Sequence, residues 1–261
     1  MTAAAAPIVE CRGVTVGYDP ERPTLTGIDL RIDAGEIVVL LGPSGCGKST
    51  LLRTLTGLMP PIAGEVLLFG EPFYQLTGDE RRALLRRTGT LFQQDALFGS
   101  MTIGDNVELP LRETTRLPGA VIREMAAIKL GLVGLAGLGH RSPSQLSGGQ
   151  RKRAALARAT VLDPELVLCD EPSAGLDPTV AAGIDQTFLR LRALFGSAFV
   201  VVTHEIESAR TIADRALVLA GGRIRAAGTI AELVDSTDPV VRGFFHRAPP
   251  EAARAAATRT P

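Results

Sequence analysis

The run from Gly42 to Thr50 has the residue types and spacing that bind a phosphate group. It reads Gly-Pro-Ser-Gly-Cys-Gly-Lys-Ser-Thr and matches the pattern G-x-x-x-x-G-K-S/T. Glycines let successive backbone N–H groups point inward around an anion. Lys48 can then reach the β- and γ-phosphates of a nucleotide, and the Ser49 hydroxyl can ligate Mg²⁺. The candidate nucleotide-binding residues of this loop are Gly42, Pro43, Ser44, Gly45, Cys46, Gly47, Lys48, Ser49 and Thr50.

A loop of this kind needs a strand before it and a helix after it. The apolar run Ile37–Leu41 predicts a buried strand. Leu51, Leu52 and Leu55 follow at helical spacing and predict a helix over about 48–57. The loop therefore lies between a strand and a helix N-terminus, which is the context that the pattern requires.

A second set of candidate residues follows the run Leu166–Cys169, four apolar residues that predict another buried strand. Asp170 ends this strand and Glu171 comes directly after it. Ligands bind at the carboxyl edge of open α/β sheets, so both carboxylates are expected there. Asp170 is placed to hold Mg²⁺, and Glu171 is the candidate general base that activates water.

A third candidate site is the segment Leu146–Gln150, which precedes a basic amphipathic helix. Free N–H groups and the helix dipole make such an N-terminus an anion site. As a short motif it is equally an ordinary capped helix. Two separate phosphate-binding helix N-termini in one chain are explained if two copies pair head to tail. Each phosphate-binding loop would then be closed by residues of the other copy: Ser147, Gly148, Gly149 and Gln150.

Composition narrows the class of protein. The 261 residues include 28 Lys plus Arg and 28 Asp plus Glu, a balance that argues against a nucleic-acid partner. The short cationic runs, such as Arg151 to Arg153, are interpreted as solvated helix faces. Cys11, Cys46 and Cys169 lack metal-site spacing and indicate a reduced compartment. An accessible thiol at Cys46, inside the loop, would make activity sensitive to alkylation.

The chain divides into a few segments. We expect a flexible N-terminus over 1–7, one large α/β domain over 8–236 and a tail over 237–261 with a disordered end. Helical periodicity dominates 95–160 and predicts a helical subdomain inserted into the domain. Asp79 is expected to cap a helix that runs to Arg87. No apolar run approaches the roughly 20 residues that span a bilayer, so a membrane process would be served through a partner.

Taken in order, these motifs make the chain resemble the ATPase subunits of ABC transporters over about 8–235. The resemblance implies an α/β fold, a P-loop NTPase nucleotide-binding domain with an N-terminal antiparallel β subdomain and an inserted helical subdomain. It adds four candidate residues to those above. They are Tyr18, which would stack on adenine, the Q-loop glutamine Gln93, the D-loop residue Asp177 and the switch histidine His204.

The resemblance also implies ATP and Mg²⁺ as cofactors. The catalytic residues would be Lys48, Gln93, Glu171 and His204, and the metal ligands would be Ser49, Gln93 and Asp170. Gln94 is a less favoured alternative to Gln93. The D-loop reads Ala-Gly-Leu-Asp where many relatives have Ser-Ala-Leu-Asp, but Asp177 is retained.

The expected partners are a second copy of the chain and integral membrane permease subunits docked between Gln93 and Asn106. The segments Asp95–Val107, Leu109–Pro118 and Thr237–Phe245 resemble the ATPases of Mla/Mce-type lipid transporters. That resemblance implies transport of phospholipid or another hydrophobic substrate, an Mce-domain or periplasmic lipid-binding component, and a peripheral location on the cytoplasmic face of the inner membrane. The alternatives are an ATPase for polar amino-acid import and a soluble ABC ATPase. A small regulatory subunit and the contact made by the Phe244–Phe245 pair, expected to be exposed, stay open.

Overall fold

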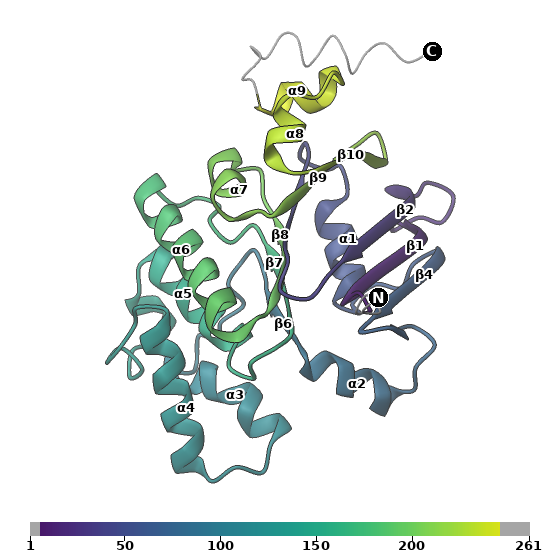
Figure 1. The fold of residues 1–261 in the computed structure, drawn as a ribbon. Helices are drawn as coiled ribbons and strands as arrows, with labels where there is room; N and C mark the ends of the chain where they lie inside the picture. Colours follow the sequence, from purple (N-terminus) through teal and green to yellow (C-terminus); the bar gives the residue numbers. More distant parts are fainter. Residues whose placement is uncertain (1–5, 246–261) are drawn as a thin grey trace, which may run out of the picture.

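The computed structural model describes residues 6–245, which form two β-sheets flanked by helices (Figure 1). Residues 1–5 of the N-terminus predicted to be flexible over 1–7, and residues 246–261 of the tail predicted over 237–261, lie outside the described residues. The smaller sheet has the order β2-β1-β4-β5, and the pairings β1–β2, β1–β4 and β4–β5 are antiparallel. Its strands are β1 (Val9–Val16), β2 (Leu25–Ile32), β4 (Ala63–Leu68) and β5 (Glu71–Pro72). This sheet confirms the predicted N-terminal antiparallel subdomain.

The larger sheet carries the edge at which the candidate site lies. Its order is β10-β9-β3-β8-β7-β6, with every pair parallel except β10 with β9. The carboxyl ends of the parallel strands therefore meet at one edge. The strands are β3 (Ile37–Leu41), β6 (Thr88–Leu91), β7 (Leu166–Asp170), β8 (Ala198–Val202), β9 (Arg215–Ala220) and β10 (Arg223–Gly228).

Helices cover both faces of the larger sheet (Figure 1). Helix α1 lies between this sheet and the antiparallel one, while α5, α6 and α7 lie on the opposite face, and α3 and α4 extend beyond the β6 end. The helices are α1 (Lys48–Leu55), α2 (Gly78–Arg86), α3 (Ile103–Thr114), α4 (Gly119–Leu132), α5 (Gly148–Ala159), α6 (Pro178–Phe195), α7 (Ile206–Ile212), α8 (Ile230–Val234) and α9 (Pro239–Phe245), with a short 3₁₀ turn η1 at Pro143–Gln145.

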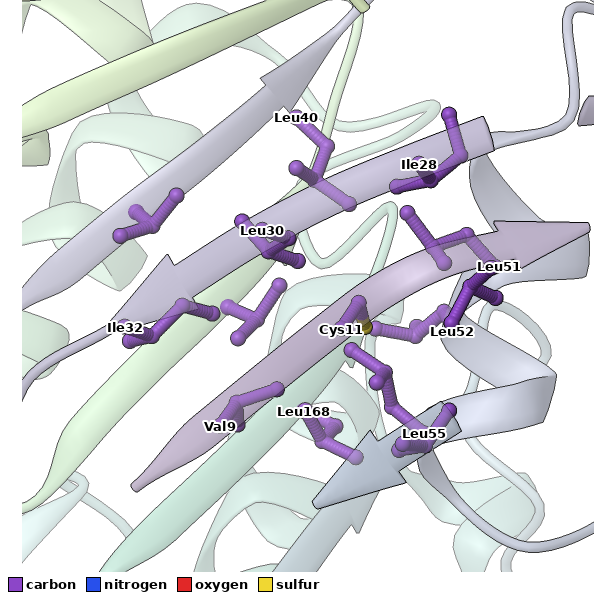
Figure 2. Close-up of a cluster of buried hydrophobic side chains, with 14 of the residues drawn as sticks. Val9, Cys11, Ile28, Leu30, Ile32, Leu40, Leu51, Leu52, Leu55 and Leu168 are labelled. Carbon is purple, nitrogen blue, oxygen red and sulfur yellow. The ribbon is translucent and has the colours of Figure 1, made fainter. Parts of the chain in front are cut away.

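Strand β3 is apolar throughout because both faces of the larger sheet are covered. Val38 and Leu40 point into the core shared with the antiparallel sheet, and Ile37, Val39 and Leu41 point into the core under α5 to α7. Successive strand side chains alternate between faces, so a continuous apolar run is needed where both faces are covered. Figure 2 shows the first of these cores, where side chains of β1, β2 and α1 meet.

The helices α3, α4 and α5 share a separate apolar cluster. Ile103, Val107 and Leu111 lie on one face of α3 and pack with Ile122 and Leu130 of α4. Their spacing of four residues along α3 and eight along α4 is that of the apolar face of an amphipathic helix. This part of the chain carries the segment Ser147–Gln150 at the start of α5.

Two local expectations are wrong. Thr77, rather than Asp79, caps α2, because its N–H group donates to Glu80 Oε2 at 2.9 Å in a capping box. Asp79 instead pairs with Arg82. Phe245 is not exposed, since only 9% of its surface is accessible and it packs into the core under α7.

Within residues 6–245, none of the helices combines the length and the apolar composition that a membrane crossing requires.

Candidate functional site

The phosphate-binding loop lies between β3 and α1, as predicted, and its shape depends on glycine. Gly42, Gly45 and Gly47 have φ of 155°, 79° and 105°, which side chains disfavour. A Cβ at Gly47 would also lie 2.7 Å from the Leu25 side chain, and one at Gly42 would overlap the Leu219 carbonyl. Substitution at these positions would therefore move the loop away from the sheet edge.

Lys48 is held inside this loop. Its side chain is among the buried charged groups, and Nζ donates to the carbonyl oxygens of Gly42 at 2.7 Å and Pro43 at 3.0 Å. A lysine is rarely buried without partners, so these carbonyls stabilise its charge at the helix N-terminus. The arrangement keeps an ammonium group beside the backbone N–H groups of the loop.

The Ser49 hydroxyl and the Asp170 carboxylate lie together, as expected. Ser49 Oγ donates to Asp170 Oδ1 at 3.0 Å, although the two residues are 121 positions apart in the chain. Both line a cavity of about 310 Å³ that Gln93 and Gln94, after β6, also line. The parallel register of β6 with β7 brings these oxygen-bearing side chains to one edge of the sheet.

Glu171 and His204 form a second pair beside this cavity. His204 Nδ1 lies 2.9 Å from Glu171 Oε2, and His204 Nε2 lies 3.3 Å from Glu205 Oε1. Glu171 Oε2 is buried and has no aligned hydrogen-bond donor among residues 6–245, so its contact with His204 is an ion-pair distance only. Glu171 has φ of 50°, and its N–H group donates to the Val202 carbonyl at 2.9 Å. A left-handed non-glycine residue is strained, and such strain concentrates at functional sites.

A cavity of about 410 Å³ gathers most of the predicted site. It is lined by residues from the turn after β1, the loop, α1, the segment after β6 and the end of β7: Tyr18, Thr24, Ser44, Gly45, Gly47, Lys48, Ser49, Thr50, Gln93 and Glu171. Tyr18 is 68% exposed, and its hydroxyl contacts the Arg53 guanidinium. Thr24 and Arg53 were not predicted, because neither belongs to a recognisable spacing.

The segment Ser147–Gln150 lies elsewhere. Ser147 is exposed and caps α5, with its Oγ accepting from the Gln150 N–H group at 3.3 Å and its N–H donating to Gln150 Oε1 at 3.0 Å. A Cβ at Gly149 would overlap the Val180 side chain of α6, so glycine permits close packing there. Across the described part of the chain, neither cavity beside the phosphate-binding loop has a lining residue from this segment.

Asp177 has a defined role within its own chain. It is exposed and caps α6, with Oδ1 accepting from the Val180 N–H group at 3.0 Å. Because Val180 also packs on Gly149, the cap of α6 and the start of α5 share one surface. The structure thus places Asp177 beside the segment Ser147–Gln150 and away from the two cavities of the loop.

The three cysteines differ in environment. Cys46 is half-buried, with Sγ 3.9 Å from Lys48 Nζ. Burial raises the pKa of the Cys11 thiol to about 12 and also raises the pKa of Cys169. Cys46 is therefore the thiol best placed to react. Between residues 6 and 245, no cluster of three or more His, Cys, Asp or Glu side chains has the geometry of a metal site.

One sequence interpretation is wrong. The run from Arg151 to Arg153 is not simply a solvated helix face, because Lys152 is 7% exposed and contacts the carbonyl oxygen of Gln93. The helical spacing of the charges could not reveal this, since the partner segment lies 59 residues away in the chain.

These motifs and this fold define a nucleotide-hydrolysing cassette. The model of the ABC transporter family matches residues 25–174, and the chain belongs to this family as its ATP-hydrolysing subunit. The chain is 41% identical over 238 residues to the "Probable ribonucleotide transport ATP-binding protein mkl" of Mycobacterium leprae, covering 91% of this chain and 68% of that protein. It is 38% identical over 245 residues to the "Intermembrane phospholipid transport system ATP-binding protein MlaF" of Escherichia coli K12, covering 94% and 91%.

Solved structures show the same architecture. The ATP-binding cassette MJ0796, a dimer in a post-hydrolysis state bound to ADP and Pi, matches with a TM-score of 0.78 and 35% identity, covering 85% of this chain and 98% of that one. The protein cbiO1 of Clostridium perfringens, part of the ABC transporter complex cbiONQ, matches with a TM-score of 0.81 and 26% identity, covering 97% and 99%. These matches confirm the predicted fold class.

Proposed function

We propose that this chain hydrolyses ATP at sites shared between two copies and drives a permease that moves phospholipid. One observation carries the ATPase part of the proposal. Lys48, Ser49, Asp170 and Glu171 lie at one edge of the parallel sheet, with Ser49 Oγ and Asp170 Oδ1 3.0 Å apart. The edge thus combines a phosphate cradle, a pair of metal-binding oxygens and a carboxylate base.

Mg²⁺ suits the residues present. Its preferred ligands are oxygens, which the Ser49 hydroxyl, the Asp170 carboxylate and the Gln93 amide supply around one cavity. We assign these three residues to hold the ion. When bound, Mg²⁺ neutralises charge on the β- and γ-phosphates of ATP.

The protein groups divide the remaining work. The backbone N–H groups of Gly42 to Thr50 and the Lys48 ammonium bind the phosphates and stabilise the negative charge that develops during transfer. Tyr18, exposed at the mouth of the larger cavity, is placed to stack on the adenine ring. Glu171 accepts a proton from the attacking water. His204, which lies beside the Glu171 carboxylate, contacts the γ-phosphate.

A second copy completes each site in this proposal. Ser147 is exposed at the N-terminus of a 12-residue helix, and no residue of Ser147–Gln150 lines the described cavities of its own loop. The N–H groups there would bind the γ-phosphate held by the partner copy, and Asp177 would lie at the same junction. The dimeric cassette with bound ADP and Pi supports this arrangement.

The proposed cargo is phospholipid. The relatives carry two kinds of name, ribonucleotide transport and intermembrane phospholipid transport. The chain spans 86% and 91% of the two MlaF proteins but only about two thirds of the mycobacterial proteins, 66% to 68%. The MlaF names agree with the resemblance of Asp95–Val107 and Leu109–Pro118 to lipid-transporter ATPases, and we therefore favour the phospholipid system. The proposed partners are membrane permease subunits, an Mce-domain or periplasmic lipid-binding component and a small regulatory subunit, with the chain on the cytoplasmic face of the inner membrane.

Glu171→Gln tests the catalytic assignment. It removes the base while keeping the size of the side chain, so hydrolysis should fall by about 10²–10⁴-fold. ATP binding should persist, and the variant should form an ATP-dependent dimer in sedimentation experiments. Glu207→Gln is the matched control, because Glu207 is an exposed glutamate on α7, and it should hydrolyse at the wild-type rate. Wild-type hydrolysis by Glu171→Gln would show that another group is the base.

The proposal that the transported substrate is phospholipid can be tested in cells that lack the chain. Loss of the chain should change the phospholipid composition of the outer layer of the envelope and leave amino-acid and ribonucleotide uptake unchanged. An uptake defect with an unaltered lipid composition would contradict the phospholipid proposal but not the ATPase assignment.

A further inference from the structure

The segment Phe92–Ala96, which we name the glutamine loop, has a strained conformation that contacts both within the segment and from helix α5 hold in place. Asp95 and Ala96 have φ of 57° and 51°, in the left-handed region that few non-glycine residues adopt. Within the segment, the Asp95 N–H group donates to the Phe92 carbonyl at 3.1 Å and the Ala96 N–H group contacts the Gln94 carbonyl. Strain of this kind persists where the surrounding structure also holds the backbone. The loop carries Gln93, so whatever holds it also positions the Gln93 side chain at the nucleotide cavities.

Helix α5 provides those contacts through its cations. Lys152 Nζ lies 3.0 Å from Asp95 Oδ1, in an ion pair without hydrogen-bond alignment, and it contacts the Gln93 carbonyl oxygen. The side chains of Lys152 and Asp95 are only 8% and 16% exposed. Charges this buried interact more strongly than surface pairs, because water screens them less. Arg151 adds a longer contact, with Nε 3.6 Å from Asp95 Oδ2.

Arg158 holds the end of the same loop. Its guanidinium donates to the carbonyl oxygens of Ala96 at 2.6 Å and Asp95 at 3.1 Å. Burial lowers the pKa of Arg158, and the Asp95 charge opposes this effect. Cations separated by almost two turns of α5 therefore hold the loop along its length.

The opposite end of α5 begins at Ser147, its N-cap. An intact helix of 12 residues moves as one body, so a displacement at Lys152 is transmitted to Ser147 five residues earlier. Gln93 of the glutamine loop lines the two nucleotide cavities, whereas Ser147 is exposed and lines neither of them. Helix α5 thus connects Gln93, at the nucleotide site of its own chain, to Ser147, which is proposed to act at the site of a second copy.

We propose that the ion pair between Asp95 and Lys152 is a latch that makes the presentation of Ser147 to a second copy depend on the position of Gln93. Both are positioning residues, since they act through Gln93 and Ser147. The inference rests on the proposed shared sites and adds to them the contact by which the state of one site reaches the other. Coupling of this kind is reciprocal, so dimerisation also acts on the glutamine loop.

The test uses the full chain with Glu171→Gln as the parent, so that bound ATP persists. Asp95→Asn and Lys152→Met are introduced singly and together. ATP-dependent dimerisation is measured by sedimentation, and affinity for a fluorescent ATP analogue is measured below the dimerisation concentration. Each single variant should weaken dimerisation about tenfold and change the ATP affinity of the undimerised chain less than about twofold, since coupling between sites is typically about 5–150-fold.

The effects of the two substitutions on dimerisation should not add, and this distinguishes the latch from a general loss of packing. The double variant should be no weaker than the weaker single variant, because both break the same contact. It also removes both buried charges, so it remains folded even if a lone unpaired charge unfolds a single variant. Lys152→Arg keeps the cation and should dimerise like the parent. Glu165→Gln breaks the exposed Arg87–Glu165 pair as a control and should change neither quantity.

Two results would overturn the latch. One is parental dimerisation in the double variant. The other is an equal loss of ATP affinity and dimerisation, which would assign the pair to the binding of nucleotide within one site. A parent that binds ATP but does not dimerise would instead contradict the proposed shared site, so the two failures are distinguishable.

Discussion

The phosphate-binding loop and the segment Ser147–Gln150 are both helix N-termini, yet their surroundings differ. Around the loop, the chain places a lysine, a serine–aspartate pair and a glutamate–histidine pair. Around Ser147, the described chain supplies a capping hydrogen bond and the packing of Gly149 on α6. A helix N-terminus attracts anions in both cases. The difference is that catalytic groups gather at the first helix N-terminus, whereas the second is exposed, and we propose that it meets another copy of the chain.

Among the substitutions that distinguish these two helix N-termini, the largest expected effect comes from Lys48. Lys48→Met removes the cation that the Gly42 and Pro43 carbonyls hold, so phosphates lose a charged donor at the site. We expect hydrolysis to fall by about 10²–10³-fold or more, with a marked loss of ATP binding, as for removal of one transition-state donor. Steady-state hydrolysis and nucleotide titration measure the two effects. Full ATP binding by this variant would show that the loop amides suffice without Lys48.

Alkylation distinguishes the two regions chemically, because Cys46 lies in the loop and Ser147–Gln150 has no thiol. N-ethylmaleimide should modify Cys46 before the buried Cys11 and Cys169, whose pKa values burial raises. Hydrolysis should fall by about tenfold or more, because a bulky adduct separates the loop from phosphate. ATP should slow the reaction, and Cys46→Ser should be resistant. Inactivation of Cys46→Ser at the wild-type rate would place the sensitive thiol elsewhere.

Gly148 and Gly149 allow the packing of the segment Ser147–Gln150 to be tested by matched substitutions. A Cβ at Gly149 would overlap Val180, whereas one at Gly148 would lie 3.4 Å from Leu176 Cδ2. Gly149→Ala should therefore destabilise the chain by about 1–3 kcal/mol, the cost of overpacking. Gly148→Ala should change stability by less than about 0.5 kcal/mol, as expected without such a clash. Urea unfolding measures both, and equal values would show that α6 moves aside at little cost.

The smallest effect concerns Asp185, buried in α6, which continues from the Asp177 cap. Burial raises the pKa of Asp185 above its ordinary 3.8, and a hydrogen bond from Ser208 opposes the shift. The folded state therefore binds the proton more tightly than the unfolded state, so this residue's contribution to stability declines as pH rises through the window above 3.8.

Asp185→Asn removes that dependence. The melting temperature of the variant, relative to wild type, should rise by about 2–4 °C between pH 4 and pH 7 if the difference amounts to about 1 kcal/mol. A relative melting temperature that does not change with pH would show that the pKa of Asp185 is the same in the folded and unfolded states.

Much of the loop region could be predicted from sequence because its determinants are local. The glycines, Lys48 and Ser49 are consecutive, and the apolar run Ile37–Leu41 identifies the strand that precedes them. The hairpin of β9 and β10 around Gly221 is local in the same sense, because its two strands are consecutive in the chain.

The errors concern contacts between distant segments. Lys152 looks solvated within a cationic run, but it is buried and contacts the glutamine loop. Phe245 looks exposed near the end of the chain, but it packs under α7. Neither contact leaves a signal in the spacing of residues along one helix.

The central claim is that each loop works with Ser147 of another copy. Mixing a Lys48→Met chain with a Ser147→Arg chain tests it most directly, because a mixed dimer has one site with both substitutions and one with neither. Each variant alone should be inactive, and the equimolar mixture should recover up to about 25% of wild-type hydrolysis, since half of the dimers are mixed and half of their sites are intact. Full activity of Ser147→Arg alone, with no gain on mixing, would contradict the account.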